Sequence, residues 1–178
     1  MKSIVVYSSV TGNTKMVAEA IAEELGAKQE LFPVERAPID VECDLVAVGF
    51  WVNRGNADIK TAKYLQQLKN KNVALFATLG AYPDSQHAFD SIKNAAQFLD
   101  ESNKVVGSFI CQGKVNPKLI ERMTEMFPKG HSHEINEKRR QRHKVASTHP
   151  DENDLMNAKK KFGLIKETIE EMLEPYKE

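Results

Sequence analysis

The feature that most constrains this chain is a short polar loop between an apolar run at residues 4–7 and a helical pattern that begins near Lys15. The loop holds four hydroxyl side chains, one amide and one glycine within seven residues. At a strand-to-helix junction, such a loop presents backbone N–H groups at the positive end of the helix dipole, where a dianionic phosphate is stabilised. The pattern predicts a phosphate-binding loop, with an ordinary capped turn as the alternative. Its members are Ser8, Ser9, Val10, Thr11, Gly12, Asn13 and Thr14.

Spacing excludes two common phosphate motifs. The nucleoside-triphosphate loop needs glycine, four residues and then Gly-Lys-Ser/Thr, whereas Lys15 follows the only glycine of this loop by three residues. The dinucleotide fingerprint needs three glycines in the order G-x-G-x-x-G, and this loop has one. The loop therefore belongs to a different class of phosphate site.

Short apolar runs alternate with longer helical patterns along the chain. The runs lack an in-out alternation, which is typical of strands buried on both faces of a parallel sheet. A weaker run at residues 29–33 contains Pro33, which favours an edge position. The alternation predicts one α/β domain, residues 1–178, with helices on both faces of a five-stranded sheet. The four strong runs lie at residues 4–7, 45–50, 73–77 and 105–111.

Four helices are predicted beside these strands. Gly26 ends the first, Asn56 or Asp58 caps the second, Asp84 or Ser85 starts the third, and the last runs from near Asp151 to Pro175. Residues 34–43 are too few for a helical crossover, so an irregular loop or a single turn is expected there. The predicted buried faces are Val17, Ile21 and Leu25; Ile59, Ala62, Leu65 and Leu68; Phe89, Ile92, Ala96 and Leu99; and Leu155, Ala158, Phe162, Ile165, Ile169 and Met172.

Two further loops that follow strands contain aromatic residues. The run at residues 45–50 leads to Trp51, the only tryptophan, and the run at residues 73–77 leads to Tyr82 in a turn with glycine and proline. A large aromatic side chain in either loop can stack on a planar ring. In parallel sheets, ligands lie beyond the carboxyl ends of the strands where the strand order reverses. We therefore expect the three loops to meet there, although each aromatic residue could instead be an ordinary surface anchor.

The segment from Ser9 to Thr14 resembles the FMN loop of the flavodoxin family, in which Ser/Thr-x-Thr-Gly-Asn-Thr is the pattern. The resemblance covers about residues 1–111 and the last helix. It implies a doubly wound sheet of order 2-1-3-4-5 with FMN as the cofactor, and Trp51 and Tyr82 on either side of the flavin ring. The implied FMN-binding residues are Ser8, Ser9, Thr11, Gly12, Asn13 and Thr14 for the phosphate, and Phe50, Trp51, Val52, Asn53, Gly55, Thr78, Leu79, Gly80, Ala81 and Tyr82 for the ring.

Residues 112–150 depart from a minimal flavodoxin, which has a short turn at this place. Asn116-Pro117 can open a short helix that carries Leu119, Ile120, Met123 and Phe127 and ends at Pro128. Residues 129–144 follow with a formal net charge of +4, so the remainder of the chain carries −4. Because parallel strands end at one edge, this insertion is expected to emerge beside the flavin. Its expected partner-contacting or substrate-contacting residues are Lys138, Arg139, Arg140, Arg142 and Lys144, with a solvated helix face as the alternative.

Several other classes of site are disfavoured. His131, His133, His143 and His149 have no carboxylate or cysteine at a recognised ligand spacing, so we expect no metal site. Cys43 and Cys111 form neither a disulfide framework nor a metal knuckle and are expected to pack inertly. No aromatic residue interleaves with the basic segment, which argues against nucleic acid. No apolar run could cross a membrane, and a cytoplasmic location is expected.

The resemblance implies an electron-transfer protein that passes electrons from FMN to a redox partner protein or to an acidic small-molecule substrate. It looks closest to the flavodoxin-like proteins of anaerobic bacteria associated with bilirubin reduction. One alternative is an FMN-dependent reductase or dehydrogenase that acts directly on a quinone or tetrapyrrole. A second alternative is an interaction module that has lost its flavin. A catalytic residue of the protein itself is not predicted, since the flavin carries the redox chemistry.

Overall fold

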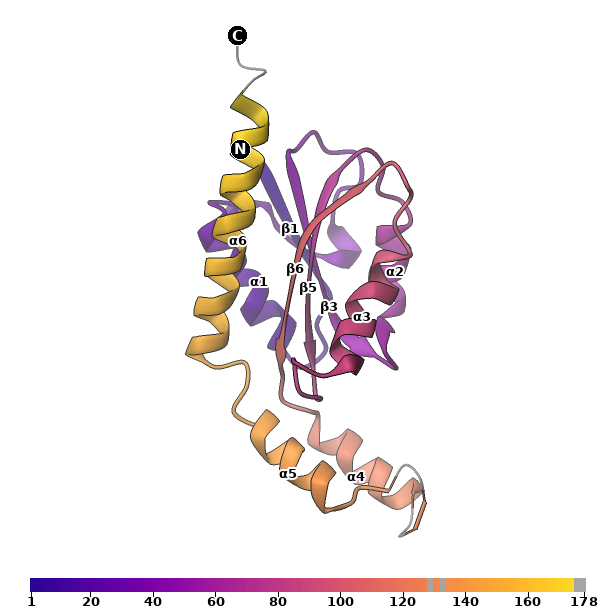
Figure 1. Cartoon of the computed structure of the whole chain (residues 1–178). Helices are drawn as coiled ribbons and strands as arrows, with labels where there is room; N and C mark the ends of the chain where they lie inside the picture. The colour runs from indigo at the N-terminus through magenta and orange to yellow at the C-terminus, as the bar shows by residue number, and fades with distance from the viewer. Residues whose placement is uncertain (128–129, 132–133, 175–178) are drawn as a thin grey trace.

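Five parallel strands form the central sheet of the computed structural model, which describes residues 1–127, 130–131 and 134–174 (Figure 1). The strand order is β2-β1-β3-β5-β6, which confirms the predicted doubly wound topology. Tyr7 pairs with Gly49 and Trp51 pairs with Thr78, so the carboxyl ends of three strands lie in register at one edge. The strands are β1 (Ser3–Tyr7), β2 (Leu31–Pro33), β3 (Leu45–Asn53), β5 (Asn72–Leu79) and β6 (Lys104–Gln112).

Helices cover both faces of the sheet (Figure 1). One apolar core lies under α1 (Asn13–Glu24) and α6 (Glu152–Leu173), and it includes an edge-to-face pair of Phe76 and Phe162 with ring centroids 5.9 Å apart. A second core lies under α2 (Ile59–Leu65) and α3 (Gln86–Ala96). The predicted caps are confirmed: the side chains of Asp58, Ser85 and Asp151 each accept a backbone N–H of the helix that follows. The proposed end of the last helix at Pro175 lies outside the described residues.

Three predicted helix faces are partly wrong. Met172 of α6 is 44% exposed. Phe89 is 75% exposed, because α3 packs on the protein through the small side chains of Ala88, Ser91 and Ala95. Ile59 is 68% exposed because it is the first residue after the cap of α2. Large apolar residues at helical spacing were therefore insufficient to place these faces. In α3, small residues form the buried side of the helix instead.

The prediction that all strong strands are buried on both faces is wrong for β6. This strand ends the sheet, and most of its residues are only half-buried. A register shift opposite Val73 and Ala74 interrupts its pairing with β5. The interruption limits further strand addition at this edge, as bulges on edge strands generally do.

A sixth, short strand was not predicted. β4 (Asn56–Ala57) pairs antiparallel with the end of β3, so that β3 extends into a hairpin. The two turn residues, Arg54 and Gly55, have φ values of 52° and 78°. A two-residue hairpin turn with positive φ at both positions matches the twist of its strands, and Gly55 adopts that conformation without strain. The hairpin rests on α3, where Asn94 Nδ2 donates to the carbonyl of Gly55 at 2.9 Å.

The link between β2 and β3 contains a single 3-10 turn, Val34–Arg36, as expected for so short a segment. Another 3-10 turn, Lys28–Glu30, precedes β2. No helix among the described residues is long and apolar enough to cross a membrane.

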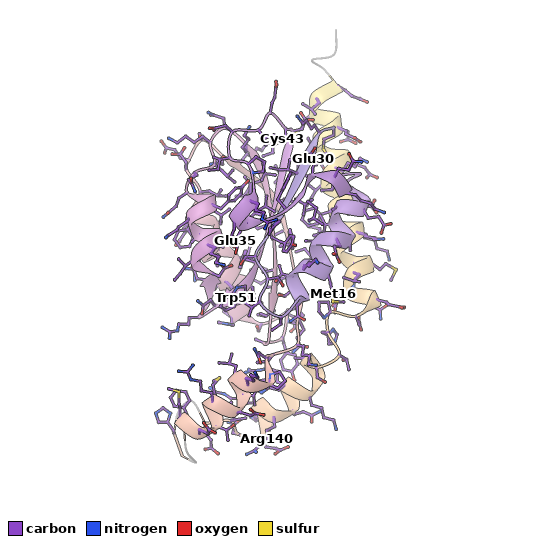
Figure 2. All side chains as sticks on the ribbon, turned by 180° about the vertical axis from the view of Figure 1, so that it is seen from behind. Met16, Glu30, Glu35, Cys43, Trp51 and Arg140 are labelled. Atoms are coloured by element: carbon purple, nitrogen blue, oxygen red, sulfur yellow. The ribbon has the colours of Figure 1, made fainter. Side chains whose placement is uncertain are left out.

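The insertion forms a pair of helices that projects beyond the carboxyl edge of the sheet (Figure 1). α4 (Pro117–Met126) begins at the predicted Asn116-Pro117, with the Asn116 side chain as its cap. α5 (Glu137–Ala146) contains the basic segment and lies beside α4 in both views (Figures 1 and 2). Pro128, Lys129 and His133, which also featured in the sequence predictions, lie outside the described residues.

Candidate functional site

A pocket of about 370 Å³ lies at the carboxyl edge of the sheet, where the three predicted loops meet. Trp51 lies at the end of the domain nearest the helix pair α4 and α5, which carries Arg140 (Figure 2). This helix pair is called the arm below. The lining comes from the first loop, from the ends of β3 and β5 with Gly80, and from the insertion, and it mixes polar and apolar side chains. The lining residues are Val10, Thr11, Asn13, Trp51, Val52, Thr78, Leu79, Gly80, Gly113, Lys114, Val115, Asn116 and Leu119.

The first loop has a cradle of free backbone donors at the start of α1. Gly12 is the N-cap of the helix, with φ at 90°, and it has no side chain to satisfy the first turn. Its own N–H donates to Ser9 Oγ at 3.1 Å. Within the described part of the chain, no hydrogen bond is made by the N–H groups of Ser9, Val10, Thr11, Asn13, Thr14 and Lys15. These donors at the positive end of a helix fit a dianionic phosphate.

Two side chains of the predicted phosphate loop already have partners in the protein. Thr14 is fully buried, and its hydroxyl lies 2.9 Å from the hydroxyl of Thr78 on β5. Asn13 Nδ2 donates to the carbonyl of Lys114 at 2.9 Å. These bonds hold the first loop against β5 and against the insertion. What Thr14 and Asn13 offer to a phosphate is therefore their backbone N–H groups.

A second, smaller pocket of about 210 Å³ adjoins Trp51 and includes Ser8, Ser9 and Asn53. Its outer rim is an ion pair between Lys60 Nζ and Glu35 Oε1 at 2.5 Å. The hydrogen bond from Lys60 lowers the pKa of Glu35 and raises that of Lys60, so both groups are charged at neutral pH. Trp51 is half-buried between the two pockets and reaches both of them.

The remaining predicted ring residues are placed less directly. Phe50 is fully buried in the core, so only its backbone is available to a ligand. Gly55 lies in the hairpin turn. Ala81 and Tyr82 follow the pocket-lining Gly80, and the Tyr82 side chain is 44% exposed outside the pocket. The role of Tyr82 as a wall of the ring stays a prediction.

Sequence reasoning expected the insertion beside the flavin but named none of the residues that it contributes to the pocket. Gly113, Lys114, Val115 and Asn116 follow β6 directly, and Leu119 lies in the first turns of α4. Their position after a strand end was a usable signal, because the carboxyl end of β6 lies at the same edge as the other three.

The basic segment forms a strongly charged helix. Lys138, Arg140 and Lys144 of α5 are exposed, whereas Arg139 and Arg142 are half-buried. The guanidinium Nε of Arg140 lies 3.9 Å from Oε2 of Glu137, a long ion pair. Burial, with Arg142 and Arg139 nearby, lowers the pKa of His143, so this histidine adds no charge at neutral pH.

His149, Asp151 and Asp154 form a small cluster where the insertion joins α6, with ligand atoms within 4.8 Å of one another. The two carboxylates already form the capping box of α6, and His149 Nδ1 lies 2.5 Å from Asp154 Oδ2. The cluster thus has a structural role at the start of a helix, where the dipole disfavours a cation. Elsewhere, burial raises the pKa of the Cys111 and Cys43 thiols, which agrees with inert packing.

Comparisons with known proteins agree with this geometry. A family model described as a flavodoxin domain matches residues 4–163. The flavodoxin-like domain-containing protein BilS of Clostridioides difficile (strain CD3) is 34% identical over 162 residues, which span 89% of this chain and 92% of the relative. The protein of the same name from Clostridium symbiosum (strain WAL-14163) is 33% identical over 172 residues, 87% of this chain and 90% of its own.

Among solved structures, a flavodoxin from the domain Archaea has the same fold, with a TM-score of 0.53 at 18% identity over 96% of this chain and 99% of its own. The family match and the two relatives, together with the sheet order and the loop at the start of α1, show that the chain belongs to the flavodoxin family.

Proposed function

We propose that this protein binds FMN at the carboxyl edge of its sheet and works as an electron carrier for a redox partner. One observation carries the proposal: a cradle of N–H groups without a partner among the described residues opens beside a largely apolar pocket that Trp51 lines. Membership of the flavodoxin family supports FMN as the cofactor. The cradle fits the phosphate, and the pocket next to Trp51 suits a planar ring.

When bound, FMN would accept and donate the electrons. The protein's own residues bind and orient it. The N–H groups of the first loop hold the phosphate, and the Thr14–Thr78 hydrogen bond fixes the distance between that loop and the end of β5. The apolar side chains of Trp51, Val52 and Leu79 exclude water from the ring.

Titration of the apoprotein with FMN tests this function. Because Trp51 is the only tryptophan and lines the pocket, FMN is expected to quench most of the tryptophan emission. Anaerobic reductive titration of the loaded protein should then show reversible electron uptake. Unchanged emission at saturating FMN would mean that Trp51 is not at the ring. A protein that takes up no FMN at all would favour the interaction module without a flavin.

The partner is proposed to be an acidic redox protein that docks on the insertion. Helix α5 carries a formal charge of +4, and the rest of the chain carries −4, so attraction is localised to the arm beside the pocket. Opposite charge at the edge of an electron-transfer site steers the partner and acts chiefly on the association rate.

Replacing Lys138, Arg140 and Lys144 with glutamine is expected to slow partner reduction several-fold at low salt and to leave FMN affinity unchanged. The rates of variant and parent should converge at high salt, because salt screens exposed charges. Stopped-flow measurements at a series of salt concentrations check this. The matched control replaces Lys63, Lys69 and Lys104, which are also exposed but lie outside the insertion. Equal effects of the two triple variants would contradict a docking role for α5.

A second candidate function is direct reduction of a quinone or tetrapyrrole. The observation that favours it is the lining of the pocket by Val115 and Leu119, which provides apolar surface beyond the three flavin loops. Sustained turnover of such an acceptor by the purified protein, without a second protein, would distinguish this enzyme from a carrier. If the acceptor is acidic and is attracted by the basic helix α5, the acceptor concentration needed for half-maximal turnover should rise with salt concentration in the same assay.

A further inference from the structure

The insertion leaves the domain at residues 113–116, here called the neck, and its other end, at His149, is hydrogen-bonded to the neck. The backbone N–H of Gly113 donates to the carbonyl of Leu79 at 2.8 Å, and that of Lys114 donates to the carbonyl of His149 at 2.9 Å. The two ends of the insertion are thus hydrogen-bonded to each other, and one of them is hydrogen-bonded to the end of β5. The neck consequently has a defined position at the mouth of the pocket.

The neck also packs closely on two of the flavin loops. Asn13 Nδ2 donates to the carbonyl of Lys114 at 2.9 Å. A Cβ atom at Gly113 would lie 2.8 Å from Asn13 Nδ2, and one at Gly80 would lie 2.4 Å from Val115 Cγ2. Both glycines are therefore required for this close approach. The insertion is not a free appendage, because the first and third loops hold its neck.

The start of α4 leaves apolar surface uncovered beside this neck. Leu119 lines the pocket, yet its side chain is 49% exposed, and α4 has no buried residue. Val115 lines the same pocket from the neck itself. Apolar side chains that converge on a pocket with Trp51 are placed to cover a planar apolar ligand.

We propose that the neck and the first turns of α4 form a fourth wall of the cofactor site, in which Val115 and Leu119 contact the isoalloxazine ring. This inference rests on the proposed function, and it adds a contact surface beyond the three loops that carry the family pattern. Because the neck is already held in place by the protein, this wall is present before the cofactor binds.

The test compares the double variant Val115→Ala/Leu119→Ala with Met126→Ala, which truncates an exposed apolar residue of α4 outside the pocket. Each is titrated with FMN and with riboflavin, which has the ring but no phosphate. The double variant is expected to lose about tenfold affinity for both ligands, since it removes apolar contact with the ring alone. Met126→Ala should bind both as the parent does. A double variant that binds like the parent overturns the fourth wall while the proposed function stands.

Hydrogen exchange gives a second readout of the same proposal. Saturating riboflavin is expected to slow exchange of the backbone amides of residues 113–120 in the parent, because the ring rests on them. When the double variant is equally saturated with riboflavin, the exchange of these amides should slow less than it does in the parent. Exchange at residues 113–120 that does not respond to riboflavin overturns the fourth wall. A parent that binds neither flavin would instead refute the proposed function, and the fourth wall with it.

Discussion

Replacing Thr11 with glutamate is expected to reduce FMN affinity by at least about a hundredfold. Thr11 lines the pocket in the middle of the N–H cradle, and its side chain is exposed to a ligand there. A carboxylate at this position would occupy the donors and repel the phosphate. Two like charges about 5 Å apart at an effective dielectric constant of about 20 repel by about 3 kcal/mol, and a phosphate carries nearly two charges. Equilibrium titration by Trp51 fluorescence measures the loss.

Riboflavin separates loss of the phosphate contact from damage to the site. Because riboflavin has no phosphate, the Thr11→Glu variant should bind it nearly as well as the parent does. Thr168→Glu adds the same charge on an exposed position of α6 and is expected to change neither affinity. If Thr11→Glu weakened FMN and riboflavin equally, the phosphate would not lie against this loop.

Local sequence was sufficient to place the first loop, and the family resemblance that this loop carries implied the order of the sheet. Ser9 to Thr14 form a contiguous motif at the junction between β1 and α1, so the loop could be recognised from consecutive residues. The apolar runs located the strands without distinguishing the edge strand β6 from the central ones. Right-handed crossovers leave few topologies for a chain of alternating strands and helices. The capping side chains of Asp58, Ser85 and Asp151 were equally readable, since each acts within three residues.

The remainder of the site depends on contacts between segments that are distant in sequence. The bond from Asn13 to Lys114 joins residues 101 positions apart, and no local pattern indicates it. Gly80 and Gly113 were visible only as glycines in loops, because the atoms they accommodate belong to Val115 and Asn13. The exposure of Phe89 has the same origin: three small residues of α3 set its packing, while the hydrophobic spacing suggested another face.

The stability of the functional edge depends on one glycine inside β3. A Cβ atom at Gly49 would lie 2.1 Å from two atoms of the Phe76 ring, which is fully buried and packs edge-to-face on Phe162. The ring therefore cannot move aside without displacing α6. The carbonyl of Gly49 also accepts the N–H of Ser8 at 2.9 Å, so this strand position anchors the first residue of the phosphate loop.

Gly49→Ala is accordingly expected to lower the free energy of unfolding by about 3 kcal/mol or more, at the upper end of overpacking effects. Urea denaturation followed by circular dichroism measures this loss. Gly163→Ala is the matched control, because that glycine lies inside α6 and its added Cβ would approach only the flexible end of Glu24 at 3.1 Å. Alanine there should be neutral or stabilising by up to about 1 kcal/mol, owing to its higher helix propensity.

A rescue variant distinguishes overpacking from a general intolerance of alanine in β3. Phe76→Leu removes the ring atoms that the new methyl group would meet, so Gly49→Ala should cost less in that background than in the parent. Gly49→Ala should also weaken FMN binding less in the Phe76→Leu background than in the parent, because the position of Gly49 fixes Ser8 at the start of the phosphate loop. Equal urea midpoints for the parent and Gly49→Ala would show that β3 and Phe76 can separate without loss, and that the glycine is not required by packing.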